Sequence, residues 1–268
     1  MAHVSVEKQV FTLCGQLTSA FLLIFVICSQ LVAQTERTTA YGVLLDNTLS
    51  LEKQFPEVVM VGKQVIKRIH KAGPVALFTF TPRRDTDFFA ILNSVDRYEG
   101  GSYLRAVGSI GTDLTQDEDA LNRYVDGLAT VKGQTDLFGA ITLMTEFLVD
   151  RSRTRKPPFT DKVIILVTDG DHRMEMIGSS QPSETEDGRR NQERQLLKRL
   201  QGSGIKVYAV GFTRGLETGS PSNLPQAAPR YRAQSFLGKL TKETGGRVVF
   251  PKSKDVYSDA LASRLLGP

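Results

Sequence analysis

The chain has 268 residues, of which 40% are hydrophobic and 24% are charged, and its formal net charge is +5. This composition is ordinary for a globular protein. The positive excess is mild and no aromatic residues alternate with it, so the sequence does not predict a nucleic-acid-binding surface.

The first 33 residues differ from the rest of the chain. Their only acidic, lysine or arginine residues are Glu7 and Lys8, and an apolar stretch follows over 21–28. This layout predicts a secretory signal peptide, with cleavage near Ala33 or Gln34, or an uncleaved N-terminal membrane anchor. We therefore expect an exported protein of the periplasm, cell envelope or medium, associated with a membrane if the segment is retained. Both cysteines, Cys14 and Cys28, lie in this segment, so the remainder has no disulfide.

Residues 34–268 alternate between strand-like and helix-like segments. Apolar runs predict strands over 41–45, 75–80, 163–167, 205–211 and 247–250, with weaker candidates at 88–92 and 103–107. Helices are predicted over 56–71, 115–129, 137–150, 188–201, 233–244 and 256–265, the second opened by a capping box from Thr115 to Glu118. Two polar stretches, 171–187 and 214–230, are predicted loops. The pattern predicts one α/β domain, with a doubly wound, mostly parallel sheet and helices on both faces.

Oxygen-bearing side chains occur in three separate segments of this domain. Asp46, Thr48 and Ser50 follow the first strand, Asp169 follows the strand over 163–167, and Thr135 precedes the helix over 137–150. Loops after parallel strands meet along one edge of an open sheet. Hydroxyls and carboxylates gathered there form an all-oxygen site suited to a hard divalent cation.

These residues resemble the von Willebrand factor type A family, and in particular its exported bacterial members. The metal-ion-dependent adhesion site of that family has the form Asp-x-Ser-x-Ser, followed by a distant Thr and a distant Asp. The matching residues are Asp46-x-Thr48-x-Ser50, Thr135 within Gly-x-Thr-x-Leu, and Asp169 within Ile-Leu-Val-Thr-Asp-Gly. Thr48 departs from the pattern, because it keeps the hydroxyl but adds a methyl group.

The resemblance implies a Rossmann-like fold and a binding module that is not an enzyme and has no catalytic residues. Thr48, Ser50 and Thr135 would ligate Mg²⁺, or Mn²⁺ or Ca²⁺ in its place, while Asp46 and Asp169 would supply charge and orient waters. A vacant coordination position would then accept an Asp or Glu carboxylate of a protein ligand. The implied function is metal-dependent adhesion through protein–protein contact.

Two other functions fit parts of the same sequence. The segment from Leu44 to Leu49 is similar to the Asp-x-Asp-x-Thr start of haloacid-dehalogenase-type, Mg²⁺-dependent phosphatases, but in either register one essential carboxylate is missing, with Leu44 or Thr48 in its place. The second alternative is a metal-free scaffold of the same fold, for which Thr48 is the only indication.

A cluster of cations precedes Pro157 and Pro158. It consists of Arg151, Arg153, Arg155 and Lys156. We interpret it as a solvated linker into the next strand; the alternative is a patch that binds an anion or a lipid headgroup.

Overall fold

The computed structural model describes residues 38–80, 113–130, 137–170, 186–212, 229–252, 256, 258 and 260–267. By its internal contacts the chain divides into Met1–Arg37 and Thr38–Pro268, and every described residue belongs to the second unit. The predicted leader over 1–33, its cysteines and the candidate strands over 88–92 and 103–107 lie outside the described residues. Among the helices that are described, none combines the length and apolar character needed to cross a membrane.

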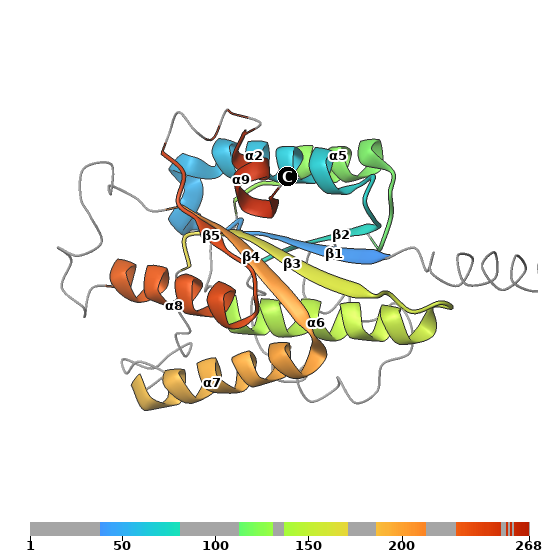
Figure 1. The fold of residues 1–268 in the computed structure, drawn as a ribbon. Helices are drawn as coiled ribbons and strands as arrows, with labels where there is room; N and C mark the ends of the chain where they lie inside the picture. The colour runs from blue at the N-terminus through green and yellow to red at the C-terminus, as the bar shows by residue number, and fades with distance from the viewer. Residues whose placement is uncertain are drawn as a thin grey trace, which may run out of the picture. The chain divides into compact units, whose positions relative to one another are not determined.

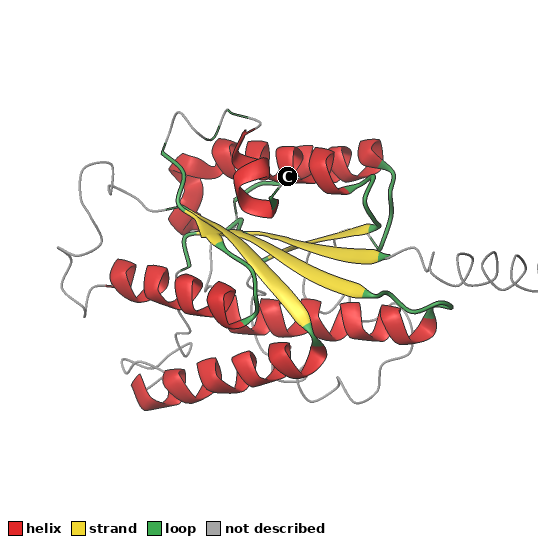
Figure 2. Cartoon of the chain, in the orientation of Figure 1, coloured by secondary structure: helices red, strands yellow, loops and turns green. Residues whose placement is uncertain are grey.

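A five-stranded sheet forms the centre of the second unit, with the strand order β2-β1-β3-β4-β5. All its ladders are parallel, and Figure 2 shows the strands running side by side. The strands are β1 (Thr39–Leu45), β2 (Val75–Thr79), β3 (Asp161–Thr168), β4 (Ile205–Gly211) and β5 (Val248–Val249). The order reverses direction at β1, so β1 and β3 flank the position at which ligands bind in sheets of this type.

Helices cover both faces of the sheet (Figure 1). One face carries α2 (Phe55–Ile69), α5 (Glu118–Asp126) and α9 (Ala260–Leu266), and the other carries α6 (Leu137–Thr154), α7 (Glu186–Ser203) and α8 (Pro229–Glu243). The fold class predicted from the sequence, a doubly wound α/β sheet, is therefore confirmed.

The alternation of side chains along the strands produces two separate cores. In β3, Ile164 and Leu166 pack into the core under α6, α7 and α8. Val163, Ile165 and Val167 point the other way and pack under α2, α5 and α9. A strand buried on both faces must be apolar at successive positions, which is why β1 and β3 appear in the sequence as continuous apolar runs.

One glycine brings α6 close to the sheet. A Cβ atom at Gly42 in β1 would lie 2.4 Å from the sulfur of Met144 in α6. Met144 is fully buried, so α6 lies on β1 at a distance that only a glycine allows.

One predicted helix start is wrong. The helix predicted over 115–129 is α5, and its N-cap is Asp117, whose side chain accepts a hydrogen bond of 3.0 Å from the backbone N–H of Ala120. The backbone of Thr115 instead pairs with Val75 in an isolated antiparallel bridge. Thr115 therefore extends the sheet locally and does not cap the helix.

Several other boundaries differ from the sequence prediction. A 3₁₀ helix, η1 (Leu49–Gln54), follows β1 and was not predicted. Because α7 begins at Glu186 and α8 at Pro229, the ends of both predicted loops are helical. The remainder of those loops, 171–185 and 214–228, lies outside the described residues.

Candidate metal site at the carboxyl edge of the sheet

Asp46 and Thr168 meet because of the register between β1 and β3. Leu45 pairs with Val167 in the parallel ladder, and the backbone N–H of Asp46 donates a hydrogen bond of 2.9 Å to the carbonyl of Val167. The next residue of each chain segment is therefore Asp46 on one side and Thr168 on the other. Both lie at the carboxyl edge of the sheet, next to the reversal of strand order.

The carboxylate of Asp46 is fully buried and accepts three hydrogen bonds. Its Oδ1 accepts from the backbone N–H of Thr48 at 3.0 Å and from the Thr48 hydroxyl at 2.6 Å. Its Oδ2 accepts from the Thr168 hydroxyl at 2.7 Å. These contacts fix both the carboxylate and the two hydroxyls in a single arrangement.

Thr48 and Ser50 place their hydroxyl oxygens side by side. The Thr48 Oγ1 atom lies 2.9 Å from the Ser50 Oγ atom. Since the single hydroxyl hydrogen of Thr48 is donated to Asp46, the Ser50 hydroxyl is the donor between the two, and a lone pair of Thr48 remains for another partner. The sequence prediction that these three residues come together is supported by this geometry.

Burial makes the Asp46 carboxyl a weaker acid than an ordinary aspartic acid. Desolvation, together with the negative charge of Asp169, raises the pKa of Asp46 from 3.8 to about 7, against the opposing effect of hydrogen bonds from Thr48 and Thr168. Negative charge is therefore held at this edge at a cost in folding free energy. A cation at the site would offset that cost.

Asp169 follows Thr168 directly and is partly exposed, beside the buried Asp46. Thr135, the third predicted hydroxyl ligand, lies outside the described residues. The described part of the site therefore consists of Asp46, Thr48, Ser50 and Asp169.

Thr168, Asn47 and Gly170 also shape the site, and the sequence did not single them out as site residues. Thr168 bonds to Asp46 and accepts a hydrogen bond of 3.0 Å from the backbone N–H of Gly170. Gly170 has a φ of 73°, and a Cβ there would lie 2.9 Å from a methyl carbon of Leu237. The side-chain amide of Asn47 donates a hydrogen bond of 3.2 Å to the carbonyl of Ala129. This bond connects the segment after β1 to the segment that follows α5.

The donors that are present fit a small, hard cation. Ligands 2.0–2.1 Å from Mg²⁺ at right angles are about 2.9 Å apart, which is the separation of the Thr48 and Ser50 oxygens. The described residues contain no cluster of three or more His, Cys, Asp or Glu side chains, so hydroxyls are needed to complete a coordination shell here. Asp46 and Asp169 supply the compensating negative charge.

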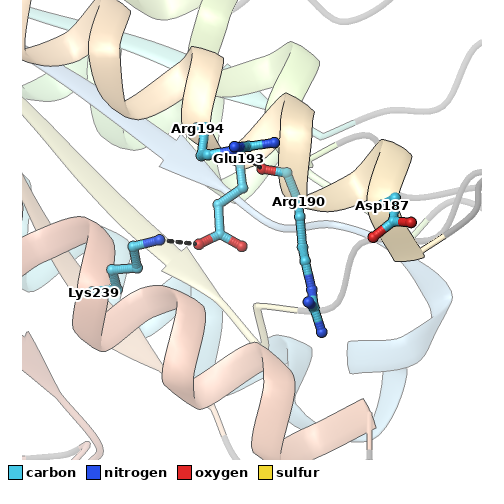
Figure 3. Close-up of a pocket in the computed structure, with 5 residues that line it drawn as sticks. All are labelled: Asp187, Arg190, Glu193, Arg194 and Lys239. Atoms are coloured by element: carbon cyan, nitrogen blue, oxygen red, sulfur yellow. Dashed lines mark hydrogen bonds and ion pairs between the residues drawn. The ribbon is translucent and has the colours of Figure 1, made fainter.

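A separate cleft of about 420 Å³ lies between α7 and α8. Figure 3 shows its charged lining, in which Lys239 of α8 forms an ion pair of 2.9 Å with Glu193 of α7. Asp187, Arg190 and Arg194 complete the lining. None of these residues belongs to the segment from Asp46 to Ser50. An entirely charged lining is also unlike the mostly apolar lining of small-molecule sites.

Comparison with known proteins identifies the family. The sequence model of the von Willebrand factor type A domain matches residues 43–236. This range includes Asp46, Thr48, Ser50, Thr135 and Asp169, and it covers most of the chain. The protein therefore belongs to the von Willebrand factor type A family, as the sequence motifs predicted. Comparison with curated protein sequences gives no match.

Solved structures share the fold at low sequence identity. The pilus adhesin SpaC from Lactobacillus rhamnosus GG is 14% identical with a TM-score of 0.51, over 86% of this chain and 30% of that one. The human COPII-coat protein Sec24c is 12% identical with a TM-score of 0.51, over 85% of this chain and 32% of that one. The chain thus spans about a third of the length of these proteins, and the likeness is one of fold alone.

Proposed function

We propose that this protein is a binding module. It binds a carboxylate of a protein ligand, and this binding depends on a divalent cation. The cation is Mg²⁺, or Mn²⁺ or Ca²⁺ in its place, held at the carboxyl edge of the sheet. Asp46, Thr48, Ser50, Thr135 and Asp169 form the site. The likeness of fold to an adhesin and to a coat protein is consistent with a protein partner.

The observation that carries the proposal is the separation of 2.9 Å between Thr48 Oγ1 and Ser50 Oγ. Two neutral hydroxyls at this distance can occupy adjacent positions around one hard cation. They leave most of the positive charge of the cation unneutralised, which favours an added carboxylate ligand.

Asp46 has a positioning role in this proposal. Its Oδ1 accepts the hydrogen bond from the Thr48 hydroxyl, so a lone pair of the Thr48 oxygen is directed away from Asp46 and is available to a cation. Its Oδ2 is held by Thr168. Because the carboxylate already accepts three hydrogen bonds, the hydroxyls rather than Asp46 are the direct ligands that we propose.

The chemistry favours binding over catalysis. A haloacid-dehalogenase-type phosphatase needs a carboxylate two residues before or two residues after Asp46. The residue before, Leu44, is fully buried in the core of the sheet, and the residue after is Thr48. A metal-free scaffold is the other alternative; it also permits the hydrogen bond between Thr48 and Ser50, and the metal titration below decides between the two.

Calorimetric titration of the metal-stripped full chain with MgCl₂ and MnCl₂ tests the proposal. We expect saturable binding at one site, an affinity at least a hundredfold lower for Asp46→Asn, and no change for Asp187→Asn, which removes an exposed carboxylate of α7 outside the site. Equal binding of the cation by all three proteins, or no binding by the wild type, would contradict the proposed metal site.

We also propose that the protein is exported, with residues 1–33 as the leader and 34–268 as the single folded domain. The proposal of export rests on the apolar stretch over 21–28. N-terminal sequencing of the protein from its native cell envelope tests it, since a cleaved leader leaves a new terminus near Ala33 and an anchor leaves Met1 on a membrane-bound chain. A full-length chain in the soluble cytoplasmic fraction contradicts export.

A further inference from the structure

A group of cations lies at the edge of the sheet opposite to the metal site. Arg153 is in the last turn of α6, Arg155 and Lys156 follow it, and Lys162 and Lys206 are the second residues of β3 and β4. We call these five residues the cationic edge. Arg153, Arg155 and Lys156 are exposed, as is Lys206. Figure 1 shows the end of α6 beside the starts of β1 and β3.

Few carboxylates neutralise the cationic edge. Lys206 lies 3.7 Å from Asp161. Within the described part of the chain, Arg153, Lys156 and Lys162 have no carboxylate within ion-pair distance. The helix dipole of α6 accounts for a cation in its last turn, but it does not account for Arg155 and Lys156 beyond the helix.

The chain enters the domain beside this same surface. The backbone N–H of Thr38 donates to the hydroxyl of Thr160 at 2.8 Å, and the carbonyl of Thr38 accepts from the backbone N–H of Thr160 at 2.9 Å. Thr160 follows Lys156 by four residues. The 37 residues before Thr38, with their uncharged apolar stretch over 21–28, therefore join the domain next to the cationic edge.

An aromatic contact holds one of these cations in place. The guanidinium of Arg155 lies 4.4 Å from the centre of the Phe159 ring, and Phe159 is buried in the core under α6. The charge of Arg155 is thereby fixed at the surface on a rigid support. A group of exposed cations, one of them held in place, is complementary to a surface with many negative charges.

We propose that the cationic edge docks on an anionic lipid bilayer, so that the metal site faces away from the membrane. Each Lys or Arg near such a surface strengthens binding by about fivefold, and stable membrane association requires a second contact in addition to an apolar segment of the chain. The seven residues of β1 separate the two edges by about 23 Å, which leaves the carboxyl edge clear for a protein ligand.

Vesicle binding by the full chain tests this. The probes are vesicles of phosphatidylcholine alone and vesicles with 30 mol% phosphatidylglycerol. We expect the anionic lipid to increase binding, and the triple variant R153Q, R155Q and K156Q to reduce that increase about a hundredfold. The charge-retaining variant R153K and R155K should bind like the wild type. Removal of divalent cations with EDTA should change nothing, since the metal site is at the other edge.

A matched control removes the same charge elsewhere. The variant R190Q, R194Q and K239Q changes three cations that line the cleft between α7 and α8 (Figure 3), and it should retain the response to anionic lipid. An equal loss in both triple variants, or no effect of anionic lipid on the wild type, overturns the proposal.

A second measurement is independent of how tightly the leader binds. Hydrogen exchange in vesicle-bound protein should be slower over residues 155–162 on anionic vesicles than on neutral ones. Identical exchange on the two kinds of vesicle contradicts docking of the cationic edge.

Discussion

The hydroxyl of Thr168 donates a hydrogen bond of 2.7 Å to the carboxylate of Asp46, across a separation of 122 residues. The bond joins the ends of β1 and β3 at the reversal of strand order, and it fixes one oxygen of a fully buried carboxylate. Thr168 is therefore a positioning residue for the proposed metal site.

Replacing Thr168 tests this positioning role. Thr168→Val should lower Mg²⁺ affinity by about tenfold to a hundredfold, as for other residues that orient metal ligands, and should lower the free energy of unfolding by about 1–3 kcal/mol. Thr168→Ser keeps the hydroxyl and should restore the affinity. Calorimetry and urea unfolding measure the two effects. If Thr168→Val binds Mg²⁺ as the wild type does, the hydrogen bond has no role in the site.

Thr48 should tolerate one substitution and not another. Thr48→Ser restores the residue that is usual in the family motif, keeps the hydroxyl that bonds to Asp46, and should change Mg²⁺ affinity by less than about threefold, because the donor set is unchanged. Thr48→Val keeps the shape and removes the oxygen, so cation binding should be lost. Equal affinity in Thr48→Val and the wild type contradicts a direct ligand role.

Ionisation of Asp46 should cost the metal-free protein stability as the pH rises. The pKa of Asp46 is about 7 in the folded protein and 3.8 as the ordinary value, so the folded state binds a proton more tightly than the unfolded state. The resulting penalty is absent below about pH 4, grows as the pH rises towards 7, and then stays constant at about 4 kcal/mol.

Other carboxylates also titrate in this range, so the prediction concerns the difference in stability between a variant without this carboxylate and the wild type. The free energy of unfolding of metal-free Asp46→Asn minus that of the wild type should increase between pH 4 and pH 7, and saturating Mg²⁺ should reduce the increase by stabilising the wild type alone. Urea unfolding at several pH values in EDTA measures it. A difference that does not change with pH shows that Asp46 titrates normally.

Two glycines offer a matched test of the packing. At Gly42 a new Cβ would lie 2.4 Å from the Met144 sulfur, whereas at Gly238, in the helix α8, nothing lies within 4 Å. Gly42→Ala should destabilise the protein by about 1–3 kcal/mol through overpacking, and Gly238→Ala should stabilise it by up to about 1 kcal/mol. Thermal unfolding in EDTA measures the change in stability of each variant. Equal effects of the two changes argue against close packing of α6 on β1.

Much of the fold could be predicted because the strands are buried on both faces. The apolar runs at β1 and β3 are continuous and that of β4 is interrupted only by Lys206, and the predicted positions of all three lie within the observed strands. Strand ends were missed where polar residues extend the ladder, as Asp161 and Lys162 do in β3. Their strand conformation depends on pairing with β1, which no local pattern records.

Helix ends depended on contacts that are distant in the sequence. Thr115 was predicted to cap α5, but it pairs with Val75 and the cap is Asp117. The 3₁₀ helix η1 has a single buried residue, Leu51, so it presents no helical periodicity. The sequence pattern predicts a loop at Pro229, but this proline is the first residue of α8, a position that suits proline.

The site could be predicted in part. Asp46, Thr48 and Ser50 are close in sequence, and the position of Asp169 after a strand placed it at the same edge. Thr168 was missed as a positioning residue because its partner is defined only by the register of β1 against β3.

The most direct test of the proposed metal site is a crystal structure of the protein grown with MnCl₂ and measured at the manganese absorption edge. A peak of anomalous density within about 2.2–2.4 Å of both Thr48 Oγ1 and Ser50 Oγ is the result that we expect. Crystals of protein saturated with Mn²⁺, with density at another position and none between these two oxygens, would contradict it.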